Sequence, residues 1–375
     1  MLRILLFASL FFSLLLNSCT SEPDPLPTIR LGHAPHDHHS ALYIVAQLPD
    51  YFKQHGNLYL EEVVFKEHYR LIDHDQPVAD VKVQSSTGGG QLIRKLHEKQ
   101  LDIAFGSVPA MIHQIDAGSS LKIVAPLMSE GAGLVLGKKA EATDWDSFVA
   151  LVKQSEKPLR IGYKIQTSVQ NLIFEQALRA EGISFSREEG NATAQLIVLN
   201  LHGAKNLIPA LKNGLIDGFV IMQPFVALAE EQGVGKTVAQ LCDLPPEQKW
   251  AGHPCCAIGA NGDLLESDRD LLSRLVTLLL RGNRYLQQYP EQSTGLVANW
   301  LGTSIEVEKS SLPTIKFLVD FPPEWHRGVS GWLETMNQQG RLTGKLNADT
   351  DAGTNAPLLY DMSIYQQARK GVFSP

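Results

Sequence analysis

Short apolar runs alternate with segments of helical periodicity along most of this chain. An apolar run over residues 28–31 breaks at Gly32, and residues 40–52 follow with apolar positions at helical spacing and Ser40 placed to cap the first turn. Strands that alternate with helices form parallel βαβ units, so the pattern predicts an α/β protein. It predicts further strands at residues 81–85, 101–105, 121–126, 159–163 and 196–201, and further helices at residues 91–99, 108–117 and 168–178.

Two stretches of the chain repeat each other. Several residues recur with the same identity 115 positions later, and they include two glycines, an aspartate and a proline that chance similarity between leucine-rich helices would not supply. Arg30 and Gly32 likewise recur 130 positions later, as Arg160 and Gly162. The repeat predicts two similarly built lobes. The pairs at the offset of 115 are Gly88 and Gly203, Leu92 and Leu207, Ile93 and Ile208, Leu96 and Leu211, Asp102 and Asp217, Pro109 and Pro224, and Gly118 and Gly233.

The chain after the second lobe is mostly helical in pattern. Residues 252–260 read as a short strand, and residues 349–355 are polar, without apolar periodicity, as is typical of a surface loop. Helices are predicted at residues 268–288, 291–300, 306–317 and 323–339.

The N-terminal segment has the pattern of an export signal. Arg3 precedes a short apolar run that ends at Leu16, shorter than the ~20 apolar residues of a membrane span. Residues 16–19, Leu-Asn-Ser-Cys, resemble a bacterial lipoprotein cleavage box. We therefore expect a signal peptide over residues 1–18 and a lipid on Cys19; the alternative is an ordinary secretory signal. Residues 19–27 are predicted to be a tether, because their three prolines favour extended chain.

Composition narrows the possible functions. The hydrophobic fraction of 44% permits full cores, and about 350 residues after the tether are more than one core usually supports. The net charge of −7 argues against nucleic acid or an anionic membrane face as a partner. Cys242, Cys255 and Cys256 do not form a disulfide framework, although Cys242 could bridge to one of the other two in an oxidising compartment.

A loop rich in histidine follows the first strand. His33, His36, His38 and His39 lie there with Asp37 between a strand and a helix, and such loops bind ligands at the carboxyl ends of open sheets. Neutral imidazoles are good ligands for zinc, iron, cobalt or nickel. One interpretation is therefore a metal held by two of His36, His38 and His39 with help from His253 or one cysteine. In the alternatives, the histidines hydrogen-bond an organic ligand or remain at the surface.

Other candidate ligand-binding residues follow strands in both halves. His253 and Cys255 are expected on the cleft wall, and strand alternation predicts that at most one of Cys255 and Cys256 faces the ligand; the alternative is that the cysteines are apolar core residues. The Gly-rich loop at residues 85–90 offers hydroxyls and N–H groups at a helix N-terminus, which would favour an anionic ligand group. A loop that only caps the helix has the same pattern. No Walker motif or catalytic triad is present. The remaining candidates are Ser86, Thr87, Gly88 and Ser107 in the first lobe, and Tyr163, Lys164, Thr167, Ser168 and Gln223 in the second.

Several segments resemble the solute-binding proteins of nitrate, sulfonate and taurine importers, a superfamily that includes receptors for the thiamine pyrimidine precursor. The likeness lies in residues 29–32, 41–46 and 51–56, in Asp-Ile-Ala at 102–104 with Pro109, in its partner segment 212–225, and in residues 301–315. The resemblance covers residues 29–317 and implies a type II periplasmic-binding-protein fold. The histidine loop and the cysteine pair depart from the family pattern, so the resemblance does not name the ligand.

The resemblance also implies a function and a domain organisation. A receptor of this kind closes on a small molecule by hinge motion and delivers it to an ABC permease and its ATPase. Lobe 1 would comprise residues 28–128 and, with the C-terminal helices, 253–375; lobe 2 would comprise 129–252, with crossings near 126–133 and 251–254. We expect a receptor without catalytic residues, with zinc or iron as the candidate metal. The alternative is a metal-dependent enzyme like the pyrimidine synthase of this fold, which export disfavours.

Overall fold

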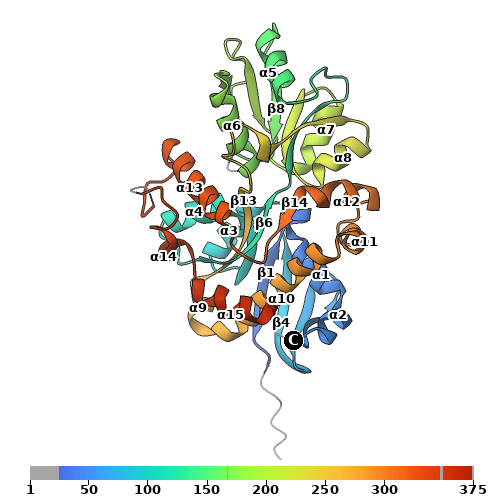
Figure 1. Cartoon of the computed structure of the whole chain (residues 1–375), viewed down its shortest axis with the longest axis vertical. Coiled ribbons are helices and arrows are strands. Elements are labelled where there is room, and N and C mark those ends of the chain that lie inside the picture. The colour runs from blue at the N-terminus through green and yellow to red at the C-terminus, as the bar shows by residue number, and fades with distance from the viewer. Residues whose placement is uncertain (1–24, 167, 347–348, 374–375) are drawn as a thin grey trace, which may run out of the picture.

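The computed structural model describes residues 25–166, 168–346 and 349–373 of the chain. It contains two sheets, each covered by helices, arranged as two lobes one above the other (Figure 1). The predicted Cys19 lipidation site and signal peptide, together with Thr167, lie outside the described residues.

The first sheet has eight strands and is mixed. β1 pairs in parallel with β4 and β5, whereas β13 is antiparallel to both β5 and β6. In spatial order the strands are β14 (Ile315–Phe317), β6 (Lys122–Glu130), β13 (Pro254–Ala260), β5 (Ile103–Ser107), β1 (Thr28–His33), β4 (Gln76–Ser85), β3 (His68–Asp73) and β2 (Leu58–Val64).

The second sheet has six strands and forms the other lobe. β8 is parallel to β10 and β11, and β7 is antiparallel to β11 and β12. In spatial order the strands are β12 (Gly235–Gln240), β7 (Ala132–Gly137), β11 (Gly218–Met222), β8 (Leu159–Tyr163), β10 (Leu196–Asn200) and β9 (Phe185–Ser186).

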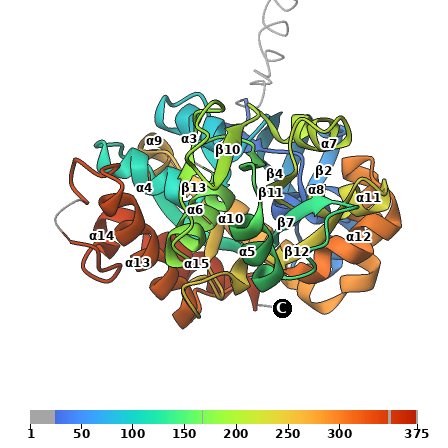
Figure 2. The ribbon, with the colours of Figure 1, turned by 90° about the horizontal axis from the view of Figure 1, so that it is seen from above.

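Helices surround both sheets, and α12 packs against α11 and against α8 of the second lobe (Figures 1 and 2). The second lobe carries α5 (Trp145–Gln154), α6 (Val169–Ala180), α7 (Leu207–Lys212) and α8 (Phe225–Glu231). The remaining helices are α1 (Ser40–Gln47), α2 (Pro49–Gln54), α3 (Gly89–His97), α4 (Val108–Asp116), α9 (Gly262–Ser267), α10 (Arg269–Gln288), α11 (Pro290–Leu301), α12 (Ile305–Ser311), α13 (Pro323–Gln338), α14 (Ala356–Leu359) and α15 (Met362–Val372).

Three local predictions were wrong. The helix expected over residues 40–52 is divided between α1 and α2, because Pro49 begins a new helix. Ser40 does not cap α1; its hydroxyl donates to the carbonyl of Asp37 at 2.7 Å. The helix expected over 306–317 ends at Ser311, and Ile315–Phe317 pair with β6 as β14.

The internal repeat corresponds to repeated contacts. Gly32 lies so close to Leu92 that a Cβ at position 32 would be 2.8 Å from the leucine side chain. Gly162 stands in the same relation to Leu207, at 3.0 Å. Each lobe therefore packs a helix leucine directly onto a glycine of its strand.

The Arg–Asp pair of the repeat is also formed in both lobes. The Asp102 carboxylate accepts hydrogen bonds from the backbone N–H of Arg30 at 2.8 Å and from its guanidinium at 2.6 Å. The Asp217 carboxylate accepts from the backbone N–H of Arg160 at 2.7 Å, with the guanidinium 3.6 Å away. The aspartates thus join the start of one strand to the start of its neighbour.

The chain passes between the sheets at Gly131, because β6 ends at Glu130 and β7 begins at Ala132. It returns before β13, where the Glu130 carboxylate accepts from the N–H of Gly252 at 2.8 Å. Gly131 has a φ of +67°, and a Cβ there would lie 2.9 Å from Nε2 of His38. A glycine at the crossing therefore permits the close approach of this histidine.

We expect Asp102→Ala to lower the free energy of unfolding by roughly 2 kcal/mol, since it removes charge-assisted hydrogen bonds from a carboxylate that is 15% exposed. The matched change Asp217→Ala should cost less than about 1 kcal/mol, because that carboxylate is 43% exposed. Denaturant unfolding of both variants measures the difference. Equal losses would contradict this account of the repeat.

Candidate functional site

The histidine loop is buried, and hydrogen bonds between its backbone and the side chains of Tyr43 and His39 hold its shape. The Tyr43 hydroxyl lies 2.9 Å from the carbonyl of Ala34 and 3.0 Å from that of His36. The backbone N–H of Ala34 donates to Nδ1 of His39 at 2.8 Å. His36, His38 and His39 are each less than 5% exposed. The loop is therefore a shaped part of the interior, which excludes the surface interpretation.

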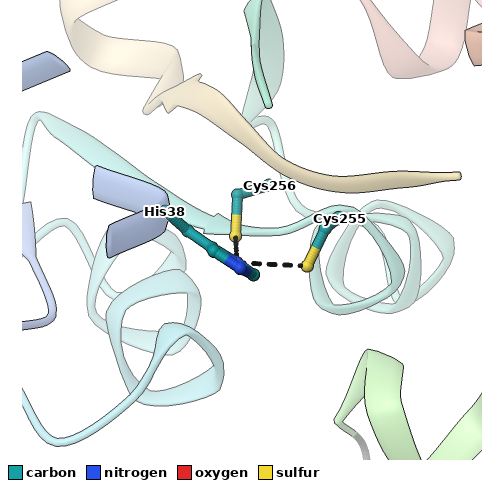
Figure 3. Close-up of side chains that lie close together, drawn as sticks. All are labelled: His38, Cys255 and Cys256. Carbon is teal, nitrogen blue, oxygen red and sulfur yellow. Dashed lines mark hydrogen bonds between the residues drawn. The ribbon is translucent and has the colours of Figure 1, made fainter. Parts of the chain in front are cut away.

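His38 is oriented by the crossing between the lobes. Its Nε2 lies 2.8 Å from the carbonyl oxygen of Gly131. A carbonyl only accepts hydrogen bonds, so Nε2 carries the proton and Nδ1 presents a lone pair. This lone pair faces Sγ of Cys255 at 3.5 Å and Sγ of Cys256 at 3.9 Å (Figure 3).

Both cysteines approach His38, so the prediction that at most one faces the site is wrong. β13 is irregular: Pro254 pairs with Ser129 of β6 and Cys256 with the adjacent Met128, which leaves Cys255 as an extra residue. A β-bulge of this kind interrupts side-chain alternation. Trp332 stabilises the bulge, because its Nε1 donates to the carbonyl of Pro254 at 3.0 Å.

The geometry of this group fits a metal ion. Two ligands about 2.0 and 2.3 Å from one ion, at roughly tetrahedral or trigonal angles, lie ~3.5–3.7 Å apart. The Nδ1–Sγ separations of 3.5 and 3.9 Å are close to this spacing. The ligand atoms of His38, Cys255 and Cys256 all lie within 4.8 Å of one another. In the described part of the chain, this is the group of three side chains that could hold an ion.

A cavity of about 20 Å³ adjoins the group, lined by residues of both lobes. Lys164 contributes from the second lobe, where its Nζ lies 3.3 Å from Sδ of Met222. Gln170 approaches the first lobe with Nε2 3.9 Å from Sγ of Cys255. The lining consists of His36, His38, Gly89, Gly90, Ser107, Cys255 and Cys256 from the first lobe, and Lys164, Ile165, Ser168, Val169, Gln170 and Met222 from the second.

The thiol pair and the lysine affect one another. The pKa of Cys255 is held well below its ordinary value, because the Cys256 thiol donates a hydrogen bond to it and His38 lies close. The pKa of Cys256 is well above its ordinary value, because it donates that bond and is buried. Burial lowers the pKa of Lys164, and the nearby cysteines oppose this shift. The site therefore favours a thiolate on Cys255 over one on Cys256.

The predicted site residues separate into two groups. Six of them line the cavity: His36, His38, Ser107, Lys164, Ser168 and Cys255. His36 and His39 do not join His38 in the metal-capable group, because Nδ1 of His39 accepts from the backbone instead. Ser107 and Ser168 also cap α4 and α6.

The other predicted residues lie away from the cavity lining. His33 packs edge-on between Tyr43 and Trp300, with ring centroids 5.7 and 5.8 Å away. His253 is directed to the carbonyl of Trp250, 2.8 Å from Nδ1. The contacts of the rest are local or remote from the cysteines: Ser86 and Thr87 donate to Gln91, Gly88 precedes α3, Tyr163 ends β8, and Gln223 contacts Thr314 and Ala227.

Sequence reasoning missed Gln170 and Met222 and did not select Cys256. Met222 ends β11 directly before Gln223, so the strand-end rule that selected Gln223 was one residue out. Gln170 stands in the first turn of α6. The bridge that the sequence left open for Cys242 is not formed, since Cys242, Cys255 and Cys256 are all free thiols.

Two α/β lobes with a cavity between them define the class of type II periplasmic binding proteins. The NMT1-like family matches residues 22–302, more than half of the chain, so the chain belongs to that family. Family and fold agree with the resemblance inferred from the sequence. Over the described residues, no helix combines the length and apolarity needed to cross a membrane.

Solved structures agree in fold. The ligand-binding component of an ABC-type import system from Staphylococcus aureus, with zinc bound, is 17% identical with a TM-score of 0.69, over 91% of this chain and 99% of that one. The nitrate-binding protein NrtA from Synechocystis is 17% identical with a TM-score of 0.69, over 93% and 90%. The alkanesulfonate-binding protein SsuA from Xanthomonas axonopodis, bound to MOPS, is 14% identical with a TM-score of 0.63, over 90% and 99%.

Proteins similar in sequence match only part of this chain. An uncharacterised protein from Methanocaldococcus jannaschii is 33% identical over 31% of this chain and 81% of that protein. The bicarbonate transport ATP-binding protein CmpC from Synechococcus elongatus is 28% identical over 45% of this chain. The match spans only 25% of CmpC.

His33 generates a prediction about acid stability. Burial lowers its pKa from 6.5 to about 4, so the folded state binds a proton less readily than the unfolded state. The stability contributed by the neutral ring is complete above pH 6.5 and is lost as the pH falls to about 4. Between pH 7 and pH 4.5 the free energy of unfolding should fall less for His33→Phe than for the wild type. The difference between the two falls should be at most about 3 kcal/mol. Unfolding at both pH values, with the exposed His97→Phe as control, measures the effect; parallel pH profiles would refute it.

Proposed function

We propose that this protein is the substrate-binding receptor of an ABC importer. The observation that carries the proposal is the cavity between the lobes, to which His38 and Cys255 contribute from one side and Lys164 and Gln170 from the other. A ligand that contacts both lobes stabilises the closed state by its differential affinity for that state. Closure would then present the loaded protein to a permease.

The comparisons support a receptor more than an enzyme. Proteins of similar fold include a ligand-binding component of an import system, a nitrate-binding protein and an alkanesulfonate-binding protein. The synthase-like alternative requires cytosolic precursors, whereas residues 1–18 have the pattern of an export signal. The receptor is therefore the preferred function.

We also propose the arrangement of the receptor. Its lobes are residues 28–130 with 253–375, and residues 132–252, because β6 continues in the first sheet two residues past the predicted boundary at 128; they hinge at the two crossings. A lipid on Cys19 anchors it to a membrane, facing the periplasm or the cell exterior, where its partners are a permease and an ATPase. Nucleic acid is not a partner, given the net charge of −7.

A transition metal belongs to the proposed ligand chemistry. His38, Cys255 and Cys256 would hold it, since one imidazole and two sulfurs converge at metal–ligand spacing. Zinc and iron, expected from the sequence, both accept thiolate ligands, unlike magnesium and calcium, which prefer oxygen.

Anchoring predicts the behaviour of Cys19→Ser. The variant should move from the membrane fraction to the soluble fraction with an unchanged melting temperature, because the thiol is the site of lipidation. Cell fractionation after a high-salt wash checks this. Membrane association that survives the change would refute the anchor.

Closure predicts the effect of a bulky residue at Gly90. A Cβ at this position would lie 3.6 Å from Ile165 of the other lobe, so the indole of Gly90→Trp should hold the lobes apart. A compact chain of this length has a radius of gyration of about 21 Å, and we expect a larger value for the variant in X-ray scattering. The control is Gly190→Trp on an exposed turn with no neighbour within 4 Å. A Gly90→Trp profile identical to that of the control would count against lobe closure.

A further inference from the structure

The donor atoms at the interlobe cavity are soft. Two sulfurs and one imidazole nitrogen converge, and Met222 adds a thioether to the same lining. Thiolate and thioether ligands select Cu(I), zinc or iron–sulfur clusters, whereas carboxylates and carbonyls suit harder ions. The cavity lining contains neither aspartate nor glutamate. The site therefore has few features that would favour a hard cation.

The imidazole is already oriented for an ion. Nε2 of His38 lies 2.8 Å from the carbonyl of Gly131, which fixes the proton on Nε2 and leaves Nδ1 free to coordinate. Ligating histidines in proteins commonly donate their second N–H to a carbonyl in this way. Cys255 and Cys256 are only 2% and 5% exposed, so their thiols face Nδ1 of His38 and not solvent.

The cavity between the lobes is small. The centre of a water-sized sphere has about 20 Å³ to move in beside the ligand atoms. A single ion fits between the ligand atoms without any displacement of the lobes.

The net charge of the loaded site distinguishes monovalent from divalent soft ions. Two thiolates and the Lys164 ammonium carry a net charge of −1, which a monovalent ion neutralises. A divalent ion would leave the buried site with a net positive charge, and uncompensated buried charge is costly. Lys164 lies on the second lobe, so its ammonium neutralises the loaded first lobe only when the lobes close.

We propose that the ligand trapped between the lobes is a bare cuprous ion, held by His38 Nδ1 and the thiolates of Cys255 and Cys256, with Lys164 and Met222 closing over it. The inference rests on the receptor function proposed above and names its cargo. On binding, any proton still held by the two sulfurs passes to solvent, two Cu–S bonds and one Cu–N bond form, and copper keeps its oxidation state. The copper is thus the substrate of transport and no catalyst.

The test uses the full-length protein, reduced and kept under nitrogen. Titration with Cu(I) against bicinchoninate, a chromophoric Cu(I) chelator, should give one ion per chain, a sulfur-to-copper absorption band and a raised melting temperature. Cys255→Ser and Cys256→Ser should each weaken binding by about a hundredfold or more. Cys242→Ser is the matched control, because Cys242 is also a free thiol but lies outside the cavity, and it should bind like the wild type.

Selectivity is tested with Lys164→Gln. Removing the ammonium leaves a net charge of 0 for a divalent ion and −1 for a monovalent one, so the ratio of Cu(I) to Zn(II) affinity should fall roughly tenfold. Wild-type protein that prefers Zn(II) or Fe(II) to Cu(I) would overturn the proposal, as would cysteine variants that bind Cu(I) normally. Circular dichroism confirms that the variants are folded.

The two proposals fail separately. If Cu(I) binds through both cysteines but scattering shows no change on loading, the copper site stands and the receptor mechanism fails. If Gly90→Trp expands the protein while Cu(I) fails to bind the wild type, the receptor stands and the copper assignment falls.

Discussion

The hydrogen bond between His38 and the carbonyl of Gly131 links the candidate site to the frame of the molecule. Gly131 is the residue at which the chain leaves the first sheet, and its backbone also bonds to Thr314 and Gln223. The orientation of the imidazole is therefore fixed by the crossing between the lobes as well as by its own loop. A side chain at position 131 would collide with this ring, so the crossing and the site share one steric constraint.

The cysteine pair depends on an irregularity in a central strand. β13 lies between β5 and β6, where a regular strand would turn neighbouring side chains to opposite faces. The bulge at Cys255 brings both sulfurs to one side, and the indole of Trp332 holds the carbonyl of Pro254 there. A distortion of this kind at a site is expected to be a functional feature of a sheet.

Much of the architecture could be predicted because it rests on local patterns. The apolar alternation located β8 and α6 well, and the repeat indicated that Asp102 and Asp217 perform the same task. The site was harder. Which imidazole nitrogen is free follows from a carbonyl 93 residues away, and the bulge follows from packing against α13. Neither contact leaves a signal in the spacing of histidines and cysteines, so the sequence indicated the loop but not the ligand atoms.

The order of the strands has a consequence for synthesis on the ribosome. All strands of the second lobe, β7 to β12, are contiguous in the chain, whereas β13 must insert between β5 and β6 of the first. Domains tend to fold as units while the chain emerges. The second lobe can therefore fold while the first sheet still lacks a central strand. The cysteines reach His38 in the same step that completes that sheet, so a nascent chain cannot assemble the soft-ligand site before its first lobe is finished.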